Sequence, residues 1–265
     1  MRLDLAALLR DAVAAWRADS AVLFPLAGTT MFLPPLAARL LLPEPPARPD
    51  GELTPEAMRV LLEQVAAWIG SYGVWHLAAA AIGSLGALVI AAIYLDRTRP
   101  ALGPAFVTAL GVFPRYLLAY ALVLLAAFAV GAPVIGLVAL VVPASLAGFF
   151  VFVPFFYLSG RIMLIGPALV AERPLGAIAA IGRSWRLTRG NGWALAWLTA
   201  MAALTGWLVA SVLLMIGDLA GTGRMANPVI VAIVSVLAVS ALAAVALAMA
   251  LVGIAAYRRL ASRGI

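Results

Sequence analysis

Six long apolar runs alternate with short polar segments along the chain. Each run reaches the about 20 residues that a helix needs to cross roughly 30 Å of hydrocarbon. They cover residues 21–42, 74–95, 116–138, 141–162, 193–216 and 229–257. The pattern predicts an all-α fold, a polytopic membrane bundle of six transmembrane helices. No charged residue separates the third run from the fourth, so we expect the chain to reverse at one of the helix breakers there: Gly131, Pro133, Gly136 or Pro143.

Amphipathic segments precede the first, third and fifth runs. In residues 3–16 one helical face holds Leu5, Leu8, Leu9, Val13 and Trp16. Residues 101–115 and 174–186 show a similar pattern, and each ends in an aromatic residue close to an arginine. We expect three helices on the cytoplasmic membrane surface. The single integral membrane domain, residues 1–265, then consists of three units of surface helix plus hairpin, at about 1–95, 96–162 and 163–265. The alternative to a true repeat is chance similarity between alanine-rich helices.

A fourth amphipathic segment, residues 54–69, lies before the second run. Thr54 is a suitable helix cap, Pro55 suits the first helical position, and apolar residues follow at helical spacing. We expect a helix on the periplasmic membrane surface that turns into the second span at Gly70 or Gly73.

Composition agrees with a membrane protein. The chain is 65% hydrophobic and 11% charged, with a mean hydropathy of +1.10, whereas soluble domains average about 45–50% apolar and about 25% charged residues.

Fourteen of the 18 basic residues, all arginines, fall in segments that would share one side of the membrane. We therefore expect a multi-pass protein of the bacterial inner membrane with both termini in the cytoplasm. Topology accounts for the net charge of +7, so no nucleic-acid partner is expected. Asp4, Asp11 and Asp19 indicate a retained first span rather than a cleavable signal peptide.

Few residues offer catalytic chemistry. The chain has no cysteine, which excludes thiolate catalysis and disulfides. His76, the only histidine, stands beside Trp75 and is interpreted as an interface residue rather than a metal ligand. Asp96, Glu172 and Asp218 fall at the ends of predicted spans, which argues against a carboxylate relay for protons. No nucleotide-binding loop, nucleophile elbow or metal-ligand cluster occurs. We expect no enzyme activity, no cofactor and no metal.

Arg161 closes the fourth run, and two interpretations of it are open. Ten uncharged residues separate it from Glu172, so the fourth helix could continue to Ala171 and leave Arg161 inside the lipid boundary. An arginine at the bilayer centre costs about 2.5–3.5 kcal/mol on insertion scales, so it would need a carboxylate, helix-end carbonyls or a lipid phosphate as a partner. Alternatively, Arg161 extends to the interface and only ends the span.

The segment GRSWRLTRGNGWALAW, residues 182–197, is the only clearly basic part of the second half of the chain. We expect a helix that begins at Pro174 and ends at a left-handed Gly190. Its apolar face would hold Ile178, Ile181 and Trp185, its neighbouring face Arg183, Arg186 and Arg189, and Trp185 could stack on Arg189. Guanidinium groups suit phosphate oxygens. The sequence therefore predicts a lipid-phosphate site formed by Arg161, Arg183, Arg186 and Arg189, with Glu172, Ser184 and Trp185 supporting it.

Residues 161–197 resemble the glycerophosphodiester phosphodiesterase membrane-domain family. The residues that match its motif are Arg161, Pro167, Glu172, Gly176, Ala180, Ser184, Trp185, Leu187, Thr188, Gly190 and Trp193. In some members of that family the membrane region is joined to a soluble phosphodiesterase barrel that uses carboxylates, histidines and a metal. The resemblance implies the membrane region without this barrel, so hydrolase activity is not carried over.

Three functions fit the sequence. The first is a non-catalytic protein that contacts membrane phospholipids of the anionic leaflet and serves envelope maintenance or lipid handling. The second is a transporter or channel-like subunit with a cavity between the hairpins. The third is a membrane anchor or assembly partner for a soluble enzyme, so a protein partner or a homo-oligomer is an open alternative.

Overall fold

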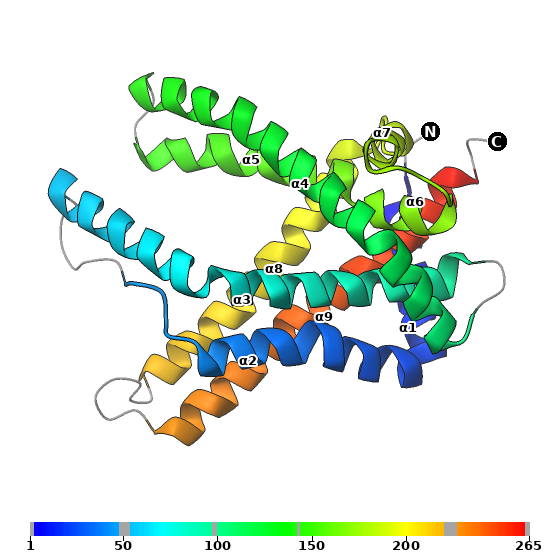
Figure 1. Ribbon diagram of the computed structural model, residues 1–265, viewed down its shortest axis with the longest axis horizontal. Helices are drawn as coiled ribbons and strands as arrows, with labels where there is room; N and C mark the ends of the chain where they lie inside the picture. The colour runs from blue at the N-terminus through cyan, green and yellow to red at the C-terminus, as the bar shows by residue number, and fades with distance from the viewer. Residues whose placement is uncertain (1–2, 48–53, 97–99, 142–143, 220–226, 263–265) are drawn as a thin grey trace. The chain divides into compact units, whose positions relative to one another are not determined.

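The computed structural model describes residues 3–47, 54–96, 100–141, 144–219 and 227–262. Nearly all of these residues are helical and none lies in a strand, so the fold is all-α (Figure 1). The helices are α1 (Leu5–Ala27), a π-helical turn η1 (Gly28–Phe32), α2 (Leu33–Leu41), α3 (Pro55–Leu95), α4 (Leu102–Val141), α5 (Ala144–Ile162), α6 (Ile165–Ala171), α7 (Ala177–Leu187), α8 (Gly192–Leu219) and α9 (Pro228–Ala261).

Six segments of the described chain are long and apolar enough to cross a membrane. They are Leu5–Leu41, Glu56–Leu95, Leu102–Leu137, Phe152–Ala171, Gly192–Gly217 and Pro228–Ala261. Each overlaps one of the predicted runs, which confirms a polytopic helical membrane protein. The fourth segment lies further along the chain than predicted and includes Arg161. The third and fourth predicted runs lie in separate helices, since α4 ends at Val141 and α5 begins at Ala144. The candidate breaker Pro143 lies outside the described residues.

Two predicted surface helices are not separate elements. α3 runs through Gly70 and Gly73 without a break, and α4 runs through Pro114 in the same way. An interior glycine costs about 1 kcal/mol relative to alanine, which weakens a helix but does not end it. Proline is tolerated in transmembrane helices because neighbouring groups satisfy the backbone. The prediction that residues 54–69 and 101–115 form independent helices is therefore wrong.

The other two surface helices do have boundaries. α1 contains a non-helical residue, Asp19 (φ −126°, ψ 23°), which separates the predicted surface segment from the first span. α7 is a separate helix, although it begins at Ala177 rather than at Pro174, because the backbone of Gly176 is extended. Gly190 has a φ of 79°, so the predicted left-handed stop between α7 and α8 is confirmed.

The chain divides into two compact units. Unit 1 consists of Met1–Leu23, Ala87–Gly206 and Val245–Ile265, and unit 2 of Phe24–Gly86 and Trp207–Ala244. Inside unit 2 the buried hydroxyl of Thr30 donates to the carbonyl of Leu26 at 2.7 Å. A Cβ at Gly86 would lie 2.1 Å from this hydroxyl oxygen, so glycine allows α3 to approach η1. His76 is exposed with its ring 5.2 Å from that of Trp68, as expected for an interface residue.

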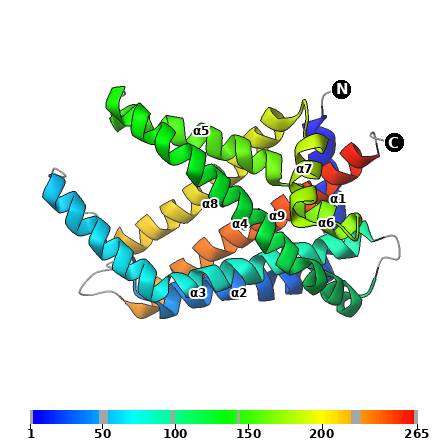
Figure 2. The same ribbon diagram turned by 45° about the horizontal axis from the view of Figure 1, so that its top comes forward.

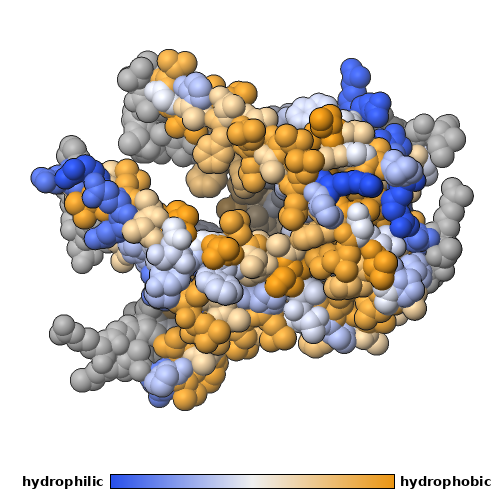
Figure 3. All heavy atoms as spheres, viewed as in Figure 1, coloured by the Kyte–Doolittle hydropathy of each residue, from blue (hydrophilic) through white to orange (hydrophobic). Residues whose placement is uncertain are grey.

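Unit 1 is built around the short helix α6. Residues Ile165, Gly166, Pro167, Ala168, Leu169 and Val170 are all buried. α4 and α7 both pack against α6, and α5 packs against α4 and α7. Figures 1 and 2 show α5 running beside α4 in both views. In Figure 3 mostly hydrophobic residues cover α4 and α5, whereas hydrophilic residues gather near α6 and α7. Charged side chains of unit 1 therefore lie near these two short helices, and others lie on α1 and at the end of α9.

Candidate functional site

α7 lies against unit 1 through a face of small residues. Ala177, Ala180, Ser184 and Thr188 are buried on this face. The predicted apolar face is the outer one, since Ile178 is 76% exposed and Trp185 is 43% exposed. Small residues let helices approach closely in membranes, and exposed apolar residues suit contact with lipid. This division leaves α7 docked on one side and apolar on the other.

The same division occurs in the first part of α4. Ala105 and Ala109 are completely buried, while Val107 is 71% exposed. In the first part of α1, Ala7, Leu8 and Ala12 are buried, whereas Leu9 and Val13, placed by the sequence on the same face as Leu8, are exposed. Alanines therefore lie on the buried face of all three segments before a hairpin, and α1 adds Leu8 to them.

Arg161 is the most unusual residue of unit 1. It is only 5% exposed, and its Nε atom has no hydrogen-bond partner among the described residues. Its guanidinium carbon lies 4.1 Å from the ring centroid of Trp185 and 5.9 Å from that of Tyr157. No carboxylate in the described part of the chain forms an ion pair with it. A buried cation without a counter-charge is costly, and stacking on aromatic rings compensates only part of that cost.

Two glycines make the position of Arg161 possible. A Cβ at Gly160 would lie 2.5 Å from the backbone nitrogen of Ala196, so α5 and α8 touch through their backbones there. A Cβ at Gly192 would lie 2.8 Å from Cδ of Arg161, so the side chain of Arg161 lies directly against the start of α8. Ser184 completes the enclosure, because its hydroxyl donates to the carbonyl of Arg161 at 2.6 Å. The predicted site residues Arg161, Ser184 and Trp185 thus come together.

The sequence predicts that Trp185 stacks on Arg189, but in the structure it stacks on Arg161. The geometry of the α7–α8 turn explains the difference. The backbone N–H of Thr188 donates to the carbonyl of Ser184, and that of Arg189 to the carbonyl of Arg186, after which the left-handed Gly190 turns the chain. Arg189 therefore belongs to the turn and is exposed, while the burial of Arg161 brings its guanidinium to the ring.

Glu172 and Arg183 form an ion pair of their own. Nε of Arg183 donates to Oε1 of Glu172 at 2.7 Å, and the hydroxyl of Tyr257 donates to the same oxygen at 2.6 Å. The two charged side chains are about one-third exposed, at 30% and 31%. Glu172 therefore neutralises Arg183 rather than Arg161, and Arg183 is less available to a ligand than the other predicted arginines.

Arg186 and Arg189 point away from unit 1. Both are exposed, and no acidic side chain in the described residues pairs with either. Trp193 and Trp197, one turn apart at the start of α8, are 58% and 64% exposed. Exposed tryptophans are typical of the membrane–water interface, where arginines meet headgroups. The basic segment thus combines two exposed arginines with two exposed tryptophans.

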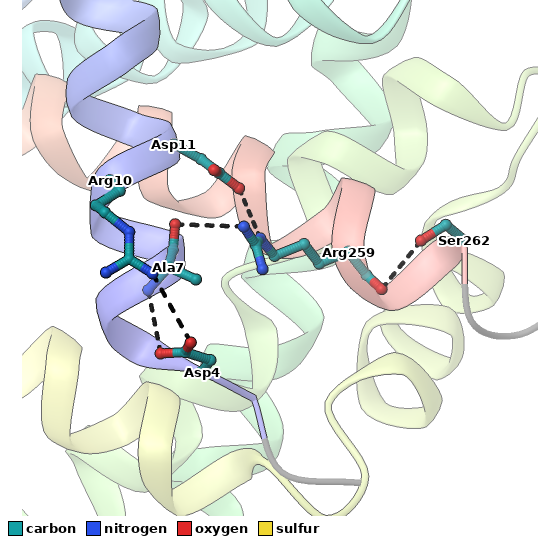
Figure 4. Close-up of polar contacts among 6 residues, drawn as sticks. All are labelled: Asp4, Ala7, Arg10, Asp11, Arg259 and Ser262. Carbon is teal, nitrogen blue, oxygen red and sulfur yellow. Dashed lines mark hydrogen bonds and ion pairs between the residues drawn. The ribbon is translucent and has the colours of Figure 1, made fainter.

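The beginning of α1 is attached to this region from two sides. The backbone N–H of Leu3 donates to the side-chain oxygen of Asn191 at 2.7 Å in a buried contact. Arg259 of α9 donates to Asp11 at 2.6 Å and contacts the carbonyl of Ala7 (Figure 4). These bonds hold the N-terminal segment beside the α7–α8 turn and the end of α9.

A small hollow of about 70 Å³ lies elsewhere in unit 1, between α3, α4, α6 and α9. Its lining is apolar except for the hydroxyl groups of Tyr116 and Tyr120, and the elements that form it belong to candidate spans. Such a lining suits an apolar group better than a charged solute.

Four contributors were missed by the sequence analysis. Tyr257 and Tyr157 were interpreted as parts of apolar spans. Tyr257 contacts Glu172, 85 residues away in sequence, and the ring of Tyr157 contacts that of Trp193, 36 residues away. Asn191 and Gly192 were not among the predicted site residues. Local sequence gave no signal for them, because Asn191 contacts Leu3 and Gly192 contacts Arg161, which are distant in sequence.

The chain was compared with family models, curated proteins and solved structures, and none matches it.

Proposed function

We propose that this protein is a non-catalytic integral membrane protein that binds phospholipid headgroups on the cytoplasmic side of the bacterial inner membrane. In this role it serves lipid handling or envelope maintenance. Two features support this function: the six segments that are long and apolar enough to cross a membrane, and the basic segment that follows α6.

One observation carries the proposal. Arg186 at the end of α7 and Arg189 in the turn after it are exposed and pair with no described acidic side chain. The exposed tryptophans Trp193 and Trp197 follow in the first two turns of α8. Each basic residue near an anionic leaflet contributes about 1 kcal/mol of attraction, and guanidinium groups bind phosphate oxygens in pairs. Arginines that only orient the chain in the membrane can also form ion pairs with acidic side chains, but no described acidic side chain pairs with Arg186 or Arg189.

The apolar hollow supports the same function. Its two tyrosines are the only polar side chains among its lining residues, which favours an apolar occupant such as a short part of an acyl chain. A transporter for a polar solute would need more polar groups facing a shared cavity. The transporter and anchor alternatives are therefore less well supported than lipid binding.

Native mass spectrometry from mild detergent tests the proposal. The wild-type protein is incubated with phosphatidylglycerol and, separately, with the zwitterionic phosphatidylcholine. We expect retained phosphatidylglycerol and a marked loss of it in the double variant Arg186→Gln/Arg189→Gln, with the loss reproduced by raising the salt concentration.

The variant Arg59→Gln is the control for loss of charge. It removes one positive charge, where the double variant removes two, from an exposed helical position that is predicted to lie on the opposite side of the membrane. It should retain the lipid as the wild type does. Equal retention of both lipids, or equal loss in the control, would contradict headgroup binding by the α7–α8 segment.

A further inference from the structure

The start of α8 is a helix N-terminus without a cap. The N–H groups of Gly192, Trp193 and Ala194 donate no hydrogen bond to any described residue, and the first internal bond runs from Leu195 to Asn191. A helix leaves its first N–H groups free unless a side chain accepts them. Asn191 stands where such a cap is expected, but its side-chain oxygen accepts the N–H of Leu3 instead.

The charged side chain beside the N-terminus of α8 is positive, whereas a helix N-terminus favours a negative charge. The aligned peptide dipoles place a partial positive charge there, and acidic residues normally stabilise it. The first turn of α8 contains no acidic residue. The charged group that lies against it is the guanidinium of Arg161, whose NH1 atom would be 3.5 Å from a Cβ built on Gly192.

Arg161 provides a second, independent sign of a missing anion. It is 95% buried, taking its 5% exposure, and its Nε donor is unsatisfied. Glu172, the nearest carboxylate in sequence, is already engaged by Arg183 and Tyr257. A buried cation and uncapped N–H groups therefore converge on Gly192, where the lack of a side chain lets Arg161 lie against the start of α8.

We propose that Arg161 and the uncapped N-terminus of α8 form a binding site for a phosphate group. A phosphate oxygen accepts well from both a guanidinium and helix N-terminal N–H groups, and its negative charge neutralises both. The inference rests on the proposed function for its preferred source, a phospholipid headgroup. Within that function it assigns recognition of the phosphate to Arg161, with Arg186 and Arg189 supplying attraction to the leaflet.

Two substitutions test the site from opposite sides. Arg161→Gln removes the cation, and Gly192→Ala inserts a methyl group where Arg161 now lies. Gly182→Ala is the matched control for the second variant, because a Cβ there meets nothing within 4 Å. Arg161→Lys keeps the charge but loses the paired donors. Circular dichroism and size-exclusion chromatography in detergent establish that each variant is folded.

The measurement is native mass spectrometry with phosphatidic acid and phosphatidylglycerol, followed by thermal unfolding with added inorganic phosphate or glycerol 3-phosphate. We expect Arg161→Gln and Gly192→Ala to bind the anionic lipids about tenfold or more weakly than the wild type, since a charge-assisted hydrogen bond is lost. Arg161→Lys should fall between them and the wild type, and Gly182→Ala should match the wild type. In lipid-free detergent, Arg161→Gln should unfold at the same temperature as the wild type or higher, because it removes an uncompensated cation.

The outcomes separate the two proposals. If Arg186→Gln/Arg189→Gln loses lipid but Arg161→Gln and Gly192→Ala do not, the phosphate site is wrong and the proposed function stands. If the wild type binds no phospholipid but is stabilised by glycerol 3-phosphate in an Arg161-dependent way, the site stands, its ligand is a soluble phosphate ester and the proposed function is wrong. If Arg161→Gln lowers the unfolding temperature without changing any binding, Arg161 is only structural and the inference is overturned. Should Arg161→Gln fail to fold, binding by Gly192→Ala and Arg161→Lys decides the question.

Discussion

The guanidinium carbon of Arg161 lies 4.1 Å from the ring centroid of Trp185, and the hydroxyl of the adjacent Ser184 donates to the carbonyl of Arg161. One turn of α7 therefore contacts both the side chain and the main chain of the residue that ends the fourth predicted span. This contact joins the surface helix to the membrane helix α5 at the point where the chain carries its buried charge. We therefore expect substitutions of Trp185 to lower stability, and substitutions of Arg161 to weaken lipid binding.

Replacement of Trp185 tests the aromatic contact. Trp185→Ala should lower the free energy of unfolding by about 2 kcal/mol, because a desolvated cation–π contact is lost, and Trp185→Phe should lose less. SDS-induced unfolding in mixed micelles measures the difference. Trp207→Ala is the control, since Trp207 is 65% exposed and no described cation lies over its ring. An equal loss in Trp185→Ala and Trp207→Ala would show that the cation contributes nothing.

Gly160 offers a test of the contact between α5 and α8. Gly160→Ala places a methyl group 2.5 Å from the backbone nitrogen of Ala196, and a backbone atom cannot move aside as a side chain does. We expect a loss of about 1–3 kcal/mol, the usual cost of overpacking, measured as a lower unfolding temperature in detergent. Gly182→Ala, in an open position of α7, should be neutral or stabilising by up to about 1 kcal/mol. Identical effects of the two alanines would mean that α5 and α8 do not touch at Gly160.

The helices and membrane segments could be predicted because hydrocarbon thickness sets a minimum length that only uninterrupted apolar runs satisfy. The division between surface helices and spans could not, because glycine weakens a helix without ending it. α3 therefore continues through Gly70 and Gly73, whereas the turn after α7 contains Gly190 in a left-handed conformation. Local sequence does not distinguish these two uses of glycine, since tertiary packing decides them.

The candidate site was predictable only in its composition. The sequence brought attention to Arg161, Arg183 and Trp185, but their partners depend on which helices approach one another. Arg183 binds Glu172 eleven residues away, and the same carboxylate receives a hydrogen bond from Tyr257, 85 residues away. Periodicity along one helix gives no information on such contacts between helices.

The topology prediction can be checked directly because the chain has no cysteine. Single cysteines at Ser262 and Thr54 occupy exposed positions at the end of α9 and before α3. We expect a membrane-impermeant maleimide to label Ser262→Cys only in inverted vesicles and Thr54→Cys only in right-side-out ones, because arginines are retained on the cytoplasmic side. The opposite pattern would refute cytoplasmic termini. Labelling of both sites from one side would refute an odd number of spans between Thr54 and the C-terminus.

The carboxylate of Glu172 should couple to both of its donors. It accepts from Arg183 and Tyr257 through a single oxygen in a partly buried position, so removing one donor leaves the charge less stabilised. A double-mutant cycle with Glu172→Gln and Arg183→Gln should give a coupling energy of about 1–2 kcal/mol, and Tyr257→Phe should couple to Glu172→Gln in the same direction. The exposed pair of Arg59 and Glu63, with side chains 70% and 66% exposed, is the matched reference and should couple by no more than about 0.5 kcal/mol. If the two ion pairs couple equally, the Glu172 cluster is as solvated as a surface pair. Glu172 would then be free to exchange Arg183 for Arg161, and the absence of a counter-charge beside Arg161 would lose its meaning.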